Sequence, residues 1–326
     1  MKIVTWLLFA VVGMACAGCG HADYCPAPAA SSASTGSTSN EPPYRSEGNP
    51  YDAGTLGVRQ VELCGSSGGP PVPLRIHTPD SAGVYAVVVL QHGFMARNIC
   101  YGGIADHLAS HGFVVVLPQM YEPGLGPLTG NPTAAEEARC VAHLLTWLGG
   151  NLSNAVGVTA RTDLLGLSGH SRGGKVAWTV MAEDPSRAKA IAGIDPVDGT
   201  GGPGGDQPRV VQGPFGFPVP SLVIGTGLGG ACAPAGDNHE QFYAASASPA
   251  WHIIATNQGH GDMLDEGCAN LAGLICESGP DRSGMRRLTA GLLTAFFRAH
   301  LQDDADALVW LYDAAAAPVP VTIDSK

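Results

Sequence analysis

A single serine stands between an apolar run and a glycine-rich turn at residues 163–178, which read DLLGLSGHSRGGKVAW. The run before Ser171 has the pattern of a buried strand, and the residues after it have the spacing of a helix. Gly169 and Gly173 lie two positions to either side, where a sharp strand-to-helix bend tolerates only small side chains. A phosphate-binding loop uses a similar turn, but this turn has neither a Lys-Ser/Thr ending nor G-x-G-x-x-G. We therefore predict that Ser171 is a nucleophile held on a strained turn.

Strand-like and helix-like segments alternate along the chain from about residue 55. Strands are predicted at 72–79, 85–93, 113–119, 163–170, 188–195, 220–227 and 251–258. Helices are predicted at 97–112, 133–152, 171–184 and 285–301. Val/Ile/Leu runs separated by helices are typical of a mostly parallel sheet with helices on both faces. Together with the G-x-S-x-G turn, this pattern predicts an α/β protein with the α/β-hydrolase fold.

The first 52 residues have the composition of an export signal followed by a tether. Residues 1–19 contain a short positive start and an apolar run too short to span a bilayer, which predicts a signal peptide. Small residues directly before Cys19 resemble the bacterial lipobox, so Cys19 is the predicted lipidation site; plain secretion is the alternative. Residues 20–52 are rich in Ser, Ala and Pro and predict a flexible tether, leaving 53–326 as the catalytic domain. The expected location is the bacterial envelope, with a lipid anchor rather than a spanning helix.

Charge and cysteine content limit the partners and the compartment. The formal net charge is −11 and the chain has no basic run, which argues against nucleic acid as a partner. Nine cysteines in an exported chain indicate disulfides. Spacing alone leaves their pairing open; we expect Cys268–Cys276 first and Cys100–Cys140 second. No cluster of Cys and His indicates a metal, and no cofactor is expected.

A serine hydroxyl needs a general base, and the late segment WHIIATNQGHGDMLDEG offers two histidines. His252 lies within the predicted strand and is expected to be packed. His260 follows the strand end between two glycines, where a loop can present its imidazole to Ser171. We therefore predict His260 as the base. The histidines on earlier elements are expected to be structural: His92, His107, His111, His170 and His239.

Two acids follow the apolar run AIAGI: Asp195 at its end and Asp198 three residues later. Because carboxyl ends of parallel strands meet at one edge of a sheet, Asp195 is expected to emerge beside Ser171 and His260. We favour Asp195 as the acid that orients the imidazole and keep Asp198 as the alternative. Three further acids are predicted to be loop carboxylates or turn formers: Asp237, Asp262 and Asp265.

Acyl transfer also needs donors for the oxyanion and a pocket for the substrate. The backbone N–H of Arg172, directly after the nucleophile, is one predicted donor, and the N–H of Phe94 in QHGFMARN is the other. The Arg172 side chain is expected to face solvent or to pair with a carboxylate. Met95 and the long loop 198–218, through Phe215 and Phe217, are predicted to line an apolar groove.

Several segments, in this order, resemble the chlorophyllase family: HGF, ASHGFVVVLPQ, GHSRGGK, GIDPVDG, LVIGTGLGG, CAPAGDNHEQF and GHGDMLD. The similarity covers roughly residues 70 to 300. It implies an α/β-hydrolase fold and cofactor-free hydrolysis of a carboxylic ester by a Ser-His-Asp triad, with the phytyl ester of chlorophyll as the type substrate. Carried over, the serine is Ser171, the histidine is His260, and the acid lies in GIDPVDG, which contains both Asp195 and Asp198. A more distant similarity, HGFMA in particular, connects the chain to platelet-activating-factor acetylhydrolases and polyester hydrolases.

The sequence thus predicts a serine carboxylic-ester hydrolase acting on a small or lipid-like hydrophobic ester through an acyl-enzyme. Two alternatives remain at this point. One is a lipase or polyester hydrolase of the same fold. The other is a lipoprotein that keeps the scaffold but only binds hydrophobic ligands.

Overall fold

The computed structural model describes residues 41–66, 68–123, 131–199 and 208–326. Its strands are β1 (Val58–Leu63), β2 (Leu74–Pro79), β3 (Val84–Gln91), β4 (Phe113–Pro118), β5 (Thr159–His170), β6 (Ala190–Ile194), β7 (Ser221–Leu228), β8 (Ala250–Gly259) and β9 (Val321–Ser325). Its α-helices are α1 (Gly102–Ser110), α2 (Ala134–Val156), α3 (Arg172–Glu183), α4 (His239–Ala245), α5 (Glu266–Ala272) and α6 (Arg282–Leu301). Short 3₁₀ helices are η1 (Asn98–Tyr101), η3 (Pro185–Arg187) and η4 (Ala305–Leu311).

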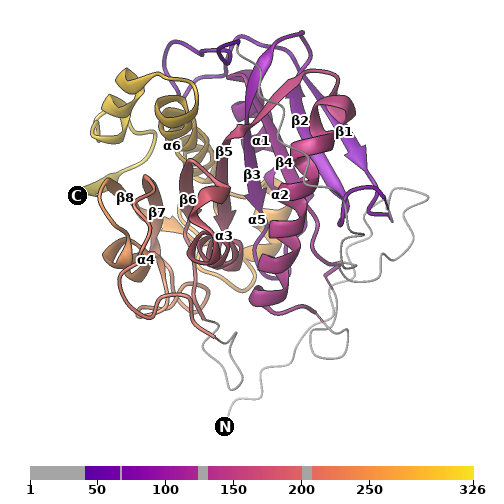
Figure 1. Ribbon diagram of the computed structural model, residues 1–326. Coiled ribbons are helices and arrows are strands. Elements are labelled where there is room, and N and C mark those ends of the chain that lie inside the picture. The colour runs from indigo at the N-terminus through magenta and orange to yellow at the C-terminus, as the bar shows by residue number, and fades with distance from the viewer. Residues whose placement is uncertain (1–40, 67, 124–130, 200–207) are drawn as a thin grey trace.

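The strands form one sheet in the order β1-β2-β4-β3-β5-β6-β7-β8-β9. The central strands β4, β3, β5, β6, β7 and β8 are mutually parallel. At the edges, β2 pairs antiparallel with β4, β1 with β2, and β9 with β8. The predicted mostly parallel sheet is therefore confirmed, and its carboxyl edge collects the loops that follow β3, β5, β6 and β8 (Figure 1).

Helices cover both faces of this sheet, because its central strands are apolar on both sides (Figure 1). In β3, Val88 and Leu90 pack into a core with α1 and α6. Their neighbours Val87 and Val89 point the other way and pack into a second core with α2 and α3. Within the described residues, no helix is both long and apolar enough to span a bilayer.

The folded domain begins before residue 53, so the boundary predicted from composition is wrong. Tyr51 is buried in the core, where its ring packs against Gly291 of α6. Ser46 is also buried, and its backbone N–H donates to Gln302 Oε1 at 3.0 Å. Composition does not reveal these packed residues, because the segment around them is rich in Ser and Pro. The predicted signal peptide, Cys19 and the first part of the tether lie outside the described residues.

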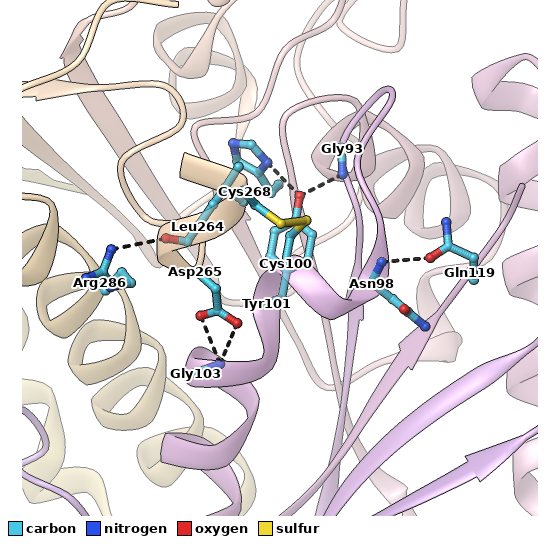
Figure 2. Close-up of a disulfide and its surroundings, with 11 residues drawn as sticks. Gly93, Asn98, Cys100, Tyr101, Gly103, Gln119, Leu264, Asp265, Cys268 and Arg286 are labelled. Carbon is cyan, nitrogen blue, oxygen red and sulfur yellow. Dashed lines mark hydrogen bonds between the residues drawn. A yellow bond between two sulfur atoms is a disulfide. The ribbon is translucent and has the colours of Figure 1, made fainter. Parts of the chain in front are cut away.

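Two disulfides are resolved as pairs: Cys100–Cys268 and Cys232–Cys276. Cys64 and Cys140 are also disulfide-bonded. Both expected pairings are therefore wrong, although the expectation of disulfides is confirmed. Cys268 lies in α5 beside η1 and reaches Cys100 (Figure 2), while Cys276 lies beyond α5 and reaches the segment after β7. Cys140 belongs to α2, on the opposite face of the sheet from Cys100.

Candidate active site

Ser171 occupies the bend between β5 and α3, with backbone angles of φ 55° and ψ −126°. A positive φ is unusual for a residue other than glycine and indicates a strained turn. A Cβ at Gly169 would lie 2.1 Å from the carbonyl oxygen of Gly173, and a Cβ at Gly173 would lie 2.5 Å from the carbonyl oxygens of Gln91 and His92. The two glycines are therefore required for the turn to close beneath the serine.

The loops after β5, β6 and β8 bring three side chains into one hydrogen-bonded row. His260 Nε2 lies 2.8 Å from Ser171 Oγ, and His260 Nδ1 lies 2.6 Å from Asp195 Oδ2. Ser171, His260 and Asp195 are all buried. The imidazole can thus donate from Nδ1 to the carboxylate and accept the serine proton at Nε2.

Asp198, the alternative acid, is turned away from His260 and holds a loop instead. Its two carboxylate oxygens accept the backbone N–H groups of Val210 and Val211 at 2.8 and 2.9 Å. The ammonium group of Lys175 lies 3.4 Å from Asp198 Oδ1, and both side chains are buried. The structure therefore places Asp195, and not Asp198, at the imidazole.

The Asp195 carboxylate is held by Thr226 as well as by His260. Thr226 donates its backbone N–H to Asp195 Oδ1 at 3.0 Å and its hydroxyl to Oδ2 at 2.7 Å. Burial raises the pKa of Asp195, but the hydrogen bond and charge of His260, together with His239 and Thr226, lower it below 3.8 overall. Asp195 is therefore a carboxylate at neutral pH.

Thr226 is a site residue that sequence reasoning missed. It lies in β7, beside β6, in the strand that carries no acid at its end. The sequence does place this hydroxyl near the end of the predicted strand 220–227, but a single threonine does not indicate which acid it contacts. Thr226, near the end of β7, therefore supports the acid that follows β6.

His252 contacts His239, which in turn lies near Asp195. His252 Nε2 lies 2.8 Å from His239 Nδ1, and the ring of His252 stacks on Tyr243. His239 Nε2 is 4.0 Å from Asp195 Oδ1. His252 is thus packed, as its position within a strand predicts, and His239 lies close to the acid.

The loop after β3 runs beside the serine. A Cβ at Gly93 would lie 3.1 Å from Ser171 Cβ, so the backbone that leads to Phe94 is in contact range of the nucleophile. Met95 has a φ of 58° and donates its N–H to the hydroxyl of Tyr121 at 2.9 Å. Arg172 begins α3, and the first N–H groups of a helix have no acceptor within the helix. Backbone donors of both segments therefore border Ser171.

The Arg172 side chain is buried and pairs with Glu137, which lies in α2. Its guanidinium group also lies 5.0 Å from the ring centroid of Phe94 and 5.8 Å from that of Tyr121. Of the two predicted surroundings, solvent or a carboxylate, the structure shows the carboxylate. The arginine connects the loop after β3 to α2.

Phe94 and the three predicted pocket residues, Met95, Phe215 and Phe217, differ in their surroundings. Phe94 and Met95, at the loop beside Ser171, each have 41% of their surface exposed, which leaves apolar surface next to the serine. Phe215 and Phe217 are buried, stack on each other at 5.5 Å, and belong to the core around Trp178. Their contacts are those of core residues, and their role in substrate binding stays a prediction.

The three weaker acids make structural contacts. Asp262 Oδ2 accepts the N–H groups of Gly259 and Gly279 at 2.6 Å each. Asp265 accepts the N–H of Gly103 at the start of α1, and Asp237 forms an ion pair with Arg209. Asp262 therefore shapes the turn that carries His260.

Four buried histidines have pKa values far below 6.5. Burial lowers the pKa of His92, His111 and His252 to about 4 and that of His170 to about 3. In the unfolded chain these side chains take up protons below about pH 6.5. Between that pH and the folded pKa the unfolded state binds more protons, so stability is full above pH 6.5 and is lost as the pH falls.

We expect the free energy of unfolding to decrease from pH 7 to pH 5.5, a range in which carboxylates titrate little. Each of these histidines contributes at most about 1.4 kcal/mol per pH unit. Urea unfolding at the two pH values measures the change. An unchanged free energy of unfolding would show that these histidines titrate equally in the folded and unfolded chain.

A cavity of about 260 Å³ lies beside the partners of Asp195, lined by Thr226, His239 and small residues of the segment after β7. Neither Ser171 nor His260 lines it, so it is not the place where the serine would meet a substrate. Among the described residues, no group of three His, Cys, Asp or Glu side chains is arranged to hold a metal ion.

Comparison with known proteins places the chain in one family. The family model named Chlorophyllase matches residues 47–326. Chlorophyllase-2 of Arabidopsis thaliana is 36% identical over 281 residues, which cover 79% of this chain and 86% of that protein. Chlorophyllase-1, chloroplastic, of Citrus unshiu is 37% identical over 271 residues, covering 78% and 80%. Chlorophyllase-1 of Arabidopsis thaliana is 33% identical over 295 residues, covering 82% and 89%.

The match extends over the whole sheet, from the segment before β1 to β9, and the relatives are similar over most of their own length. The sequence resemblance is thereby confirmed, and so are the predicted fold and enzyme class. The chain belongs to the chlorophyllase family and is a carboxylic ester hydrolase with the α/β-hydrolase fold.

Proposed function

We propose that this protein hydrolyses a hydrophobic carboxylic ester through Ser171, His260 and Asp195. The observation that carries the proposal is the hydrogen-bonded row, with 2.8 Å from Ser171 Oγ to His260 Nε2 and 2.6 Å from His260 Nδ1 to Asp195 Oδ2. A nucleophile, a base and an orienting carboxylate in this order are the arrangement that acyl transfer by serine requires.

In the first half of the reaction Ser171 Oγ attacks the ester carbonyl carbon while His260 Nε2 takes the serine proton. Asp195 stays ionised, keeps the Nδ1–H of His260 in place, and stabilises the imidazolium. The tetrahedral intermediate then collapses, the C–O bond to the alcohol breaks, and the imidazolium protonates the leaving alkoxide oxygen. An acyl-Ser171 ester and a free alcohol result.

The second half repeats the sequence with water as the nucleophile. His260 removes a proton from water, the resulting hydroxide adds to the acyl carbon, and Ser171 leaves with the proton returned by His260. In both halves the backbone N–H groups of Phe94 and Arg172 donate to the oxyanion. The position of the Gly93 backbone against Ser171 and of Arg172 at the start of α3 supports this assignment.

The proposed substrate is a small-molecule ester of a long apolar alcohol, as in chlorophyll. The names of the relatives point to chlorophyll, and the exposed apolar side chains of Phe94 and Met95 beside the serine suit an apolar chain. Both side chains belong to the loop that we assign to the oxyanion, so an alcohol chain packed on them would lie next to the scissile bond.

The test compares chlorophyll a, tributyrin and a polyester film as substrates at equal enzyme concentration. We expect chlorophyll a to be cleaved to phytol and the free acid with the highest kcat/KM. A higher kcat/KM for tributyrin or release of acid from the film would overturn the chlorophyll assignment and point to a lipase or a polyester hydrolase. If the wild-type protein cleaved none of the three substrates, the proposed function itself would be overturned.

A further inference from the structure

A second row of hydrogen bonds runs beneath the proposed catalytic row and connects its two sides. The N–H of Gly93 lies 3.0 Å from the hydroxyl of Tyr101, and this hydroxyl lies 2.8 Å from His170 Nδ1. His170 Nε2 lies 2.9 Å from the backbone carbonyl oxygen of His260. The row therefore begins at the residue before Phe94 and ends at the histidine that we assign as the base.

We propose that Tyr101 and His170 are positioning residues that hold the oxyanion loop and His260 at a fixed separation around Ser171. This rests on the function proposed above. Neither residue touches the reacting atoms; each acts through the backbone of a residue that does. Sequence reasoning predicts only a structural role for His170 and does not single out Tyr101.

The chemistry of the partners sets the direction of every bond in this row. A carbonyl oxygen only accepts, so His170 Nε2 carries the proton that it donates to His260. In a neutral imidazole Nδ1 is then an acceptor, and the Tyr101 hydroxyl donates to it. The same hydroxyl oxygen accepts the Gly93 N–H. With a neutral His170 ring, each donor meets one acceptor, and no other arrangement satisfies all three bonds.

Burial keeps this arrangement in its neutral form. Tyr101 is fully buried and His170 is 4% exposed. Burial lowers the pKa of His170 to about 3. The ring is therefore neutral throughout the pH range in which esterases are assayed. The His170 ring also packs on the His260 ring with 4.7 Å between centroids. The row therefore does not change protonation when His260 takes the serine proton.

The segment that carries Tyr101 is held by a disulfide and by a backbone hydrogen bond. Cys100, the neighbour of Tyr101, forms the disulfide with Cys268, and the N–H of Asp265 donates to the Cys100 carbonyl oxygen at 2.9 Å. Figure 2 shows the disulfide joining the two segments above Gly103, with the Tyr101 hydroxyl directed at the Gly93 backbone. The disulfide therefore links η1, which carries Tyr101, to α5, which follows the loop that carries His260.

The test replaces Tyr101 by phenylalanine, which removes one hydroxyl and leaves the ring. Tyr85→Phe is the matched control, because Tyr85 is also buried and its hydroxyl contacts the hydroxyl and carbonyl oxygens of Ser81 at 3.0 and 3.2 Å. Tyr85 lies near the amino end of β3, whereas the site lies beyond its carboxyl end. Both variants lose a buried hydroxyl with two contacts.

With p-nitrophenyl butyrate, we expect Tyr101→Phe to lower kcat about ten- to a hundredfold with KM changed less than about threefold, since small displacements of reacting groups cost rate. The inhibition constant for a boronic acid, which binds as a tetrahedral adduct, should rise by a similar factor. Tyr85→Phe should keep kcat within about twofold even where its Tm falls as far as that of Tyr101→Phe.

His170 supplies the rescue. In His170→Gln the amide N–H can still donate to the His260 carbonyl, whereas His170→Leu has no donor. We expect His170→Gln to retain more kcat than His170→Leu at matched Tm. Equal kcat in Tyr101→Phe and wild type overturns the proposal, as does an equal loss in Tyr85→Phe. The Ser171→Ala variant separates the two proposals: if Ser171→Ala is inactive and Tyr101→Phe is fully active, only the positioning role fails.

Discussion

The Ser171→Ala variant is expected to hydrolyse p-nitrophenyl butyrate about 10⁴- to 10⁶-fold more slowly than the wild type, which is the range that loss of a serine nucleophile produces. Ser171 stands on a turn with φ 55° and has its Oγ 2.8 Å from the imidazole. Because alanine also fits this turn, the variant should fold with a Tm close to that of the wild type. The loss should appear in kcat, measured at saturating ester.

Ser168→Ala is the matched control for this variant. Ser168 lies three residues earlier in β5, is fully buried, and its hydroxyl has no hydrogen-bond partner among the described residues. Its replacement should leave kcat within about twofold, since it removes a hydroxyl that makes no hydrogen bond and is not part of the row formed by Ser171, His260 and Asp195. Substantial esterase activity in Ser171→Ala would remove the serine from the mechanism.

Asp195→Asn should lower kcat about 10⁴-fold, because an amide in place of the carboxylate favours the wrong tautomer of the imidazole and cannot stabilise its positive charge. The 2.6 Å contact with His260 Nδ1 and the two bonds from Thr226 place this carboxylate under the base. The measurement is kcat with the same ester, with far-UV circular dichroism to verify folding.

Asp198→Asn serves as the comparison for Asp195→Asn, since both acids follow β6. Asp198 pairs with Lys175 and anchors the Val210 and Val211 backbone. Its replacement should lower the Tm, because a buried ammonium group loses its counter-charge, while kcat falls less than about tenfold. The reverse ranking of the two variants in kcat would assign the orienting role to Asp198.

The sequence predicts Asp195 and Asp198 as candidate acids but does not decide which of them contacts His260. The pattern of strands and helices places both at the carboxyl edge of the sheet, three residues apart, and this part of the expectation holds. Which one turns toward His260 depends on the backbone of the bend, where Asp195 has a φ of 43°, and on Thr226 from the next strand. Neither appears in the local pattern of residues.

The elements that the sequence does not predict are short or lie at the edges. β1 and β9 are five- or six-residue edge strands with partly exposed side chains, and α4 and α5 have seven residues each. Such segments carry few apolar positions, so their periodicity is weak. The central elements, buried on both faces, carry long apolar runs and are predicted within a few residues.

Disulfide pairing is set by the tertiary fold rather than by spacing. Cys100 and Cys268 are 168 residues apart, and they meet because η1 and α5 both border the site. The surroundings of Phe215 and Phe217 also depend on the tertiary fold: their rings stack on each other and belong to the core around Trp178. Side-chain direction in a long loop cannot be read from its composition.

Covalent labelling with a fluorophosphonate followed by peptide mass spectrometry identifies the nucleophile, because the reagent reacts preferentially with a serine that a neighbouring base activates. We expect one adduct, on Ser171 within the peptide that spans residues 163–178. We also expect no adduct in Ser171→Ala and slower labelling in Asp195→Asn. An adduct on another residue, or an unlabelled wild-type protein, would contradict Ser171 as the nucleophile.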